Sequence, residues 1–157
     1  MMIEKRIHAY CVQETWQLHD YMLTIRGYTV LHHGMDEKTQ RLGRTSAGVM
    51  IILGPDLTHA WTRAGKLEPI TSSPISRFPG RMIGFTLSLP KFSNRPGDMY
   101  HRRAKGSIKL FLCSVYHPCD PEEQKEFYDD LDNFIARQPR NSELLMGADV
   151  NCNVGTR

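Results

Sequence analysis

The sequence lacks any apolar run of transmembrane length, any internal repeat and any low-complexity segment. A membrane-spanning helix needs about 20 consecutive apolar residues, and residues 1–6 contain no apolar core of a secretory signal. These absences argue against a protein with helical membrane spans and against a repeat architecture. The chain of 157 residues is long enough for one domain, residues 1–157, with a substantial hydrophobic core.

Cysteine is also scarce, and its spacing is not that of a disulfide framework. The four cysteines are Cys11, Cys113, Cys119 and Cys152, without a CxxC pair. This pattern predicts reduced thiols of an intracellular protein, the nucleus included. A zinc site of Cys113, His117 and Cys119 would match no standard spacing, so the sequence favours buried, unreactive cysteines.

Excess charge is small. Twenty Lys and Arg against 17 Asp and Glu give a net charge of +3, which suits a phosphate-bearing partner without requiring one. The segment 91–106 is strongly basic and contains Tyr100 and His101. Such a segment can bind a nucleic-acid backbone, although an ordinary solvated loop explains the same composition and is favoured by its frequency. Its candidate nucleic-acid-binding residues are Arg95, Arg102, Arg103 and Lys105.

Apolar periodicity and turn residues predict an alternation of strands and helices. Strands are expected at 6–12, 28–33, 47–53, 81–89, 107–116 and 144–149; helices are expected at 16–26 and 121–137, with a helical turn at 56–63. The apolar run at 47–53 predicts a strand that is buried on both faces, and Pro90 is expected to end the strand before it.

Glu14 follows directly after the first predicted strand, which is a usual place for a functional carboxylate. Leu18, Met22 and Ile25 then fall at helical spacing, which predicts the helix at 16–26, with Gly27 as its stop. The alternative is that Glu14 only complements the dipole of that helix.

Tyr116 stands at the end of the most strand-like segment, and Pro118 prevents further pairing. We expect its side chain at the same rim as Glu14, although a half-buried core tyrosine is the simpler alternative. Asp120 and Pro121 then form a typical helix start, with Asp120 as the N-cap.

The segment 144–151 predicts a short buried strand that ends on Asp149 and Asn151. In an extended chain these two side chains point to the same face, and their oxygens suit a hard cation or a phosphoryl group. Gly147 and Ala148 are small enough for other groups to approach the backbone closely. An ordinary turn after a strand is the alternative, because Asp and Asn are common in turns.

Three motifs therefore stand in order, each after a predicted strand: Gln13-Glu14-Thr15, Tyr116-x-Pro118 and Gly147-x-Asp149-x-Asn151. This arrangement resembles the endonuclease/exonuclease/phosphatase superfamily, which includes apurinic endonucleases, pancreatic-type deoxyribonuclease and the endonuclease domains of non-LTR retrotransposons. The last branch is the most similar. The resemblance implies an α/β (α+β) fold, a four-layer α/β/β/α sandwich of two packed mixed sheets.

The resemblance also implies a reaction, the hydrolysis of a DNA phosphodiester with Mg²⁺ (or Mn²⁺) as cofactor. By their motifs, Glu14 looks like the metal-binding carboxylate and Tyr116 like the tyrosine that contacts the phosphate. Asp149 and Asn151 look like the catalytic pair that positions the nucleophile and the phosphate.

Two motifs of the family are not found, an active-site Asn on an opening strand and a closing Ser-Asp-His motif. We therefore expect a sandwich incomplete at the N- and C-terminus, with weak or no activity of its own. Two further functions stay open: a catalytically dead nucleic-acid-binding module that uses residues 91–109, and a phosphatase of a small phosphate ester. No membrane partner and no obligate protein partner is expected.

Overall fold

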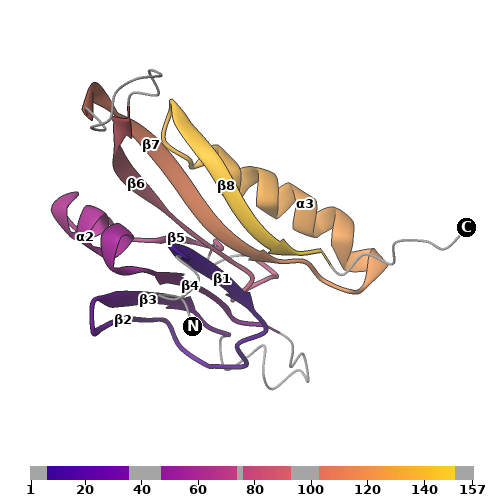
Figure 1. Cartoon of the computed structure of the whole chain (residues 1–157). Coiled ribbons are helices and arrows are strands. Elements are labelled where there is room, and N and C mark those ends of the chain that lie inside the picture. Colours follow the sequence, from indigo (N-terminus) through magenta and orange to yellow (C-terminus); the bar gives the residue numbers. More distant parts are fainter. Residues whose placement is uncertain (1–6, 36–46, 74–75, 93–102, 151–157) are drawn as a thin grey trace, which may run out of the picture.

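The computed structural model describes residues 7–35, 47–73, 76–92 and 103–150, with only the backbone of 91–92 and 103–105. Two four-stranded sheets pack face to face and two helices pack against them (Figure 1). The predicted α+β sandwich of two packed sheets is confirmed.

The first sheet contains the N-terminal strands in the order β1-β4-β3-β2. All of its pairings are antiparallel, whereas a mixed sheet was predicted. The strands are β1 (Ala9–Gln13), β2 (Tyr21–Ile25), β3 (Tyr28–His33) and β4 (Val49–Leu53). β4 is central, and its alternate residues Val49, Ile51 and Leu53 are fully buried against the other sheet, as a strand that faces a core requires.

The second sheet is mixed and has the order β5-β6-β7-β8. β7 and β8 run parallel and are joined by the helix α3, whereas the other pairs are antiparallel. The elements are β5 (Ile70–Thr71), β6 (Met82–Phe92), β7 (Arg103–Tyr116), α3 (Pro121–Ala136) and β8 (Ser142–Asp149). A parallel pair needs such a crossover, and α3 begins at the predicted cap, where Asp120 accepts a hydrogen bond from the Glu122 N–H at 2.9 Å.

The hydrophobic core has two parts, one on each face of the second sheet. Leu31, Ile51, Phe85 and Leu112 belong to the part between the sheets. The other part lies under α3, which covers the face of the second sheet that points away from the first sheet (Figure 1). The helix α2 (Pro55–Arg63) packs against β3, β4 and β6 and inserts Trp61 into the core between the sheets.

The predicted helix at 16–26 is wrong. Residues Tyr21–Ile25 form β2, which continues through a two-residue hairpin turn into β3. The turn residues Arg26 and Gly27 have φ of 51° and 83°, which is the conformation of a type I′ hairpin. The helical spacing of Leu18, Met22 and Ile25 was therefore coincidental, and Gly27 serves the hairpin instead of ending a helix.

Two other strand predictions need correction. Pro90 does not end β6 but pairs with Ser107 inside the hairpin of β6 and β7. Proline is tolerated there because the short β5 pairs only with Ile83 and Gly84, which leaves β6 unpaired on that side at Pro90 within the part of the chain described. The strand before Asp149 is not buried either, since β8 is an edge strand and Leu145 on it is 53% exposed.

Candidate functional site

Two of the predicted site residues meet across the gap between the sheets. Glu14 follows β1 of the first sheet, and Tyr116 is the last residue of β7 in the second sheet. The Tyr116 hydroxyl donates a hydrogen bond to Glu14 Oε1. Tyr116 is 1% exposed, so its ring is a core residue whose polar end reaches the rim where Glu14 is exposed.

Asp149 lies beside Tyr116 at the same rim. It is the last residue of β8 and the register partner of Tyr116 in the parallel pair, and its carbonyl oxygen accepts from the His117 N–H at 3.0 Å. Register partners in a sheet present their side chains on the same face. The structure therefore places Asp149 beside Tyr116 in the sheet and joins Tyr116 to Glu14 by a hydrogen bond. Asn151, the fourth predicted residue, lies outside the described part of the chain.

The Gln13 side chain joins β1 to β7 and β8 next to these residues. Its side-chain amide donates to Ser114 Oγ at 3.0 Å and to the Gly147 carbonyl at 3.3 Å. Ser114 and Gly147 each lie two residues before a site residue, Tyr116 and Asp149 respectively, and so on the same face of the sheet. No local pattern predicts this role of Gln13, because both partners are more than a hundred residues away in the sequence.

Gly147 is needed where β1 crosses β8. A Cβ added at Gly147 would lie 2.5 Å from Cys11 Cβ and 2.7 Å from Cys11 Sγ. Such distances are not possible without movement, so only glycine allows this approach. The predicted close approach at Gly147 is confirmed, and its partner is the strand that leads to Glu14.

The loop after β1 holds Glu14 in an unusual backbone conformation. Glu14 and Trp16 have φ of 54° and 57°, a left-handed region that non-glycine residues rarely occupy. The Thr15 and Trp16 N–H groups donate to the carbonyls of Gly48 and Ala47 at 3.1 and 3.2 Å. These bonds fix the loop to the residues before β4, so the strained conformation is maintained by its surroundings.

The His32 side chain also holds the loop after β1 in place. Its Nδ1 lies 3.0 Å from the His19 carbonyl, which can only accept, so Nδ1 carries the proton. Nε2 then accepts from the Thr15 hydroxyl at 2.6 Å. Burial lowers the pKa of His32, against the opposing effect of the bond to His19. The neutral ring is therefore the form that anchors Thr15, the neighbour of Glu14.

Arg81 is a buried cation beside the site that the sequence did not indicate. Its guanidinium lies 4.8 Å from the centre of the Tyr116 ring, and its carbonyl accepts from the Tyr116 N–H at 2.9 Å. The arrangement is a cation–π contact that fixes the tyrosine ring. Burial lowers the pKa of the neighbouring His117, and the charge of Arg81 adds to this effect.

The carboxylates at the rim are oxygen donors of the kind that hard cations prefer. The described residues contain no group of three or more His, Cys, Asp or Glu side chains that could hold a metal ion. Mg²⁺ is usually held by one or two carboxylates, with water and substrate phosphate as its other ligands. Glu14 and Asp149 match that donor set.

The predicted nucleic-acid-binding residues are only partly within the described chain. Arg95 and Arg102 lie outside it, and for Arg103 and Lys105 only the backbone of β7 is described. Their contacts with nucleic acid stay predictions. Within the described ranges, no helix has the length and apolar character needed to cross a membrane.

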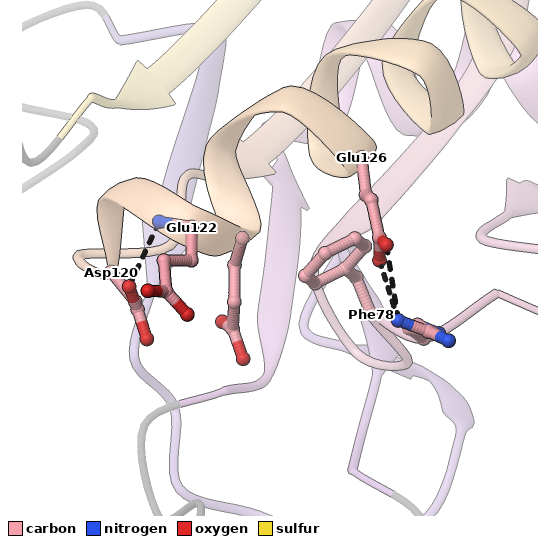
Figure 2. Close-up of a pocket in the computed structure, with 6 residues that line it drawn as sticks. Phe78, Asp120, Glu122 and Glu126 are labelled. Atoms are coloured by element: carbon pink, nitrogen blue, oxygen red, sulfur yellow. Dashed lines mark hydrogen bonds and ion pairs between the residues drawn. The ribbon is translucent and has the colours of Figure 1, made fainter.

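A surface hollow of about 280 Å³ lies elsewhere, at the start of α3 (Figure 2). Its lining is mainly acidic. Arg77 is the basic residue of the lining, and it forms an ion pair with Glu126 at 2.9 Å. An acidic lining repels phosphate, and none of Glu14, Tyr116 and Asp149 borders it. The lining residues are Arg77, Phe78, Asp120, Glu122, Glu123 and Glu126.

Comparison of the chain with protein-family models, with curated proteins and with solved structures finds no match.

Proposed function

We propose that the chain is a phosphodiesterase of nucleic acids that uses Mg²⁺ or Mn²⁺, with its site at the rim formed by Glu14, Tyr116 and Asp149. The observation that carries this proposal is the hydrogen bond from Tyr116 to Glu14 beside the carboxylate at the end of β8. Three polar side chains from three segments that are distant in the sequence thus lie at one rim.

Each residue has a role that its chemistry permits. The Glu14 carboxylate would hold the metal ion while it accepts the Tyr116 hydrogen bond, since a carboxylate has about four lone-pair sites. The bound ion would neutralise charge on the phosphate oxygens. Asp149 would orient the attacking water and accept its proton. The water oxygen bonds to phosphorus, the P–O ester bond breaks, and the departing sugar oxygen takes up a proton from solvent.

The motifs support the same chemistry. The order of Gln13-Glu14-Thr15, Tyr116-x-Pro118 and Gly147-x-Asp149-x-Asn151 resembles that of the endonuclease/exonuclease/phosphatase superfamily. By the same resemblance, Asn151 would donate a further hydrogen bond to the phosphoryl group. DNA is the substrate that the non-LTR retrotransposon branch implies.

The test is nicking of supercoiled plasmid, which detects a single cut per molecule, with Mg²⁺, with Mn²⁺ and with a chelator. We expect weak metal-dependent nicking, because two motifs of the family are not found, and we expect Glu14→Gln and Asp149→Asn to reduce it to the level seen with the chelator. Glu68→Gln is the matched control, because Glu68 is exposed and is distant in the sequence from Glu14, Tyr116 and Asp149. Equal nicking by all four proteins would contradict the proposed site.

A second assay separates the proposal from a phosphatase of small esters. Bis-p-nitrophenyl phosphate is a diester and p-nitrophenyl phosphate is a monoester, and both release the same coloured product. We expect the diester to be the preferred substrate. Preference for the monoester, lost in Asp149→Asn, would assign the same residues to a phosphatase instead.

A further inference from the structure

Trp16 is a large aromatic side chain exposed next to the proposed site. The sequence has two tryptophans. Trp61 is 1% exposed in the core, whereas Trp16 is 55% exposed. Burying a tryptophan ring stabilises a fold by several kcal/mol at most sites, so exposure of this ring forgoes that gain. Aromatic side chains that remain exposed are the groups on which single-stranded nucleic acids stack their bases.

The backbone of Trp16 is held in place. Its φ is 57°, and its N–H donates to the Ala47 carbonyl at 3.2 Å. Thr15, the preceding residue, is bonded to Gly48 through its N–H and to His32 through its hydroxyl. A left-handed conformation of a bulky residue costs about 1–3 kcal/mol and persists only where the surrounding structure holds it. The indole is therefore carried on a fixed segment of backbone, which reduces the entropy lost when it binds.

Trp16 is close to Glu14 in the chain, which brings its ring within reach of a nucleotide at the proposed phosphate position. Trp16 is two residues from Glu14, so their Cα atoms are at most about 7 Å apart. Successive phosphates of one DNA strand are spaced about 3.4 Å along the helix axis. A base of the nucleotide next to the scissile phosphate can therefore reach the ring, provided that it is unpaired and unstacked.

We propose that Trp16 is a stacking platform for an unpaired base of the nucleic acid, next to the phosphate held at Glu14, Tyr116 and Asp149. The inference rests on the proposed nucleic-acid substrate and narrows it to a strand with an exposed base. It also separates that substrate from small phosphate esters, which have no base to stack.

The test measures binding without turnover, in a chelator, by fluorescence anisotropy of labelled oligonucleotides. The probes are a twelve-residue oligothymidylate and an abasic deoxyribose-phosphate oligomer of the same length. Stacking on an aromatic side chain is worth about 1–3 kcal/mol per base, so we expect Trp16→Ala to weaken binding of oligothymidylate about 5- to 100-fold. Binding of the abasic oligomer should not change. Trp16→Phe should retain most of the affinity, because it retains an aromatic face.

Tyr10→Ala is the matched control. Tyr10 is 50% exposed on β1, and we expect its removal to leave both affinities unchanged. Intrinsic fluorescence gives a second readout in the unaltered protein: oligothymidylate should quench the exposed Trp16, and the abasic oligomer should not. Equal quenching by both oligomers, or an equal effect of Trp16→Ala on both, would overturn the inference.

The two proposals can fail separately. If Glu14→Gln and Asp149→Asn leave nicking unchanged while the difference between the oligomers depends on Trp16, the phosphodiesterase site is wrong and the platform stands. If nicking requires both carboxylates but Trp16→Ala binds oligothymidylate like the unaltered chain, the platform is wrong and the site stands. If the unaltered chain binds neither oligomer, the platform is overturned.

Discussion

The Tyr116 hydroxyl donates its hydrogen bond to Glu14, a residue 102 positions earlier in the chain, in the loop that follows β1 of the opposite sheet. At this rim, a side chain of β7 in the second sheet therefore bonds to a side chain that follows β1 of the first sheet. Tyr116 is fixed by its buried ring and by Arg81, and Glu14 is fixed by a left-handed backbone. The Tyr116 ring cannot turn away without losing its buried packing and its contact with Arg81.

This bond predicts coupling between Tyr116 and Glu14. Tyr116→Phe keeps the buried ring and removes the hydroxyl, and we expect it to lower the free energy of unfolding by about 1–2 kcal/mol. Combined with Glu14→Gln, the two changes should not add, with a coupling energy of at least about 0.5 kcal/mol. Urea unfolding of the four proteins at pH 7 measures this. Tyr10→Phe serves as the control, and fully additive changes would contradict the interaction.

Gln13→Leu should loosen the junction below the site. The substitution removes two hydrogen bonds and leaves the Ser114 hydroxyl and the Gly147 carbonyl with one donor fewer. We expect a loss of about 1–3 kcal/mol in the free energy of unfolding, because partly buried acceptors lose a partner. The control is Gln17→Leu, because the Gln17 side chain accepts an exposed hydrogen bond from the Tyr21 hydroxyl. Urea unfolding that gave equal losses for both variants would argue against the junction.

Gly48→Ala should displace the loop that carries Glu14. Gly48 has φ of 95°, and a Cβ added there would overlap Thr15 Oγ1. Gly65 has a similar φ of 89° with nothing within 4 Å, so Gly65→Ala reports the backbone cost alone, about 1 kcal/mol. We expect Gly48→Ala to cost about 1–3 kcal/mol more, from the overlap. Thermal unfolding of both variants tests the difference, and equal costs would show that Thr15 yields freely.

Acidification should destabilise the fold through His32. Burial lowers the pKa of His32 in the folded chain below 6.5, its ordinary value. The unfolded chain then binds more protons as the pH falls below 6.5, so the free energy of unfolding falls as well. Between pH 7.5 and pH 5.0 the unaltered chain should lose more stability than His32→Gln. His59→Gln, at an exposed position, should behave like the unaltered chain. If the stability of His32→Gln depended on pH as that of the unaltered chain does, His32 would not be the group responsible.

Alkaline pH should act through Cys113. Burial raises the pKa of its thiol from 9.0 to about 12, so between these values the unfolded thiol ionises and the folded thiol does not. The free energy of unfolding should therefore fall with rising pH by about 1.4 kcal/mol per unit above pH 9. Cys113→Ala should show a shallower slope, because burial also raises the pKa of the Cys11 thiol, whereas Cys119→Ser, at an exposed cysteine, should keep the full slope. Guanidinium unfolding at pH 8.5 and pH 10.5 measures both.

The parts that the sequence predicted are those with a local signal. Apolar runs marked the strands that precede Glu14, Tyr116 and Asp149, and the polar residue that ends each run marked the rim. Asp120 and Pro121 marked the start of α3 because a helix cap is a local feature.

The parts that could not be predicted depend on distant partners. Trp16 and His19 adopt positive φ, which interrupts the expected helix, and the Trp16 turn is held by Ala47 and Gly48 across the sheet. Gln13 and Arg81 act on residues of β7, and no local pattern distinguishes them from other polar residues at strand ends. Tertiary contacts overruled local propensity at these positions.

The bond from Gln13 to the Gly147 carbonyl spans 134 positions of the chain. Contacts of such sequence separation raise contact order and form slowly, after the chain has collapsed. The rim therefore cannot exist in a half-folded intermediate in which either sheet has formed alone. A ligand of the rim therefore binds only the completely folded chain. Its binding should be lost at the same denaturant concentration at which the whole chain unfolds.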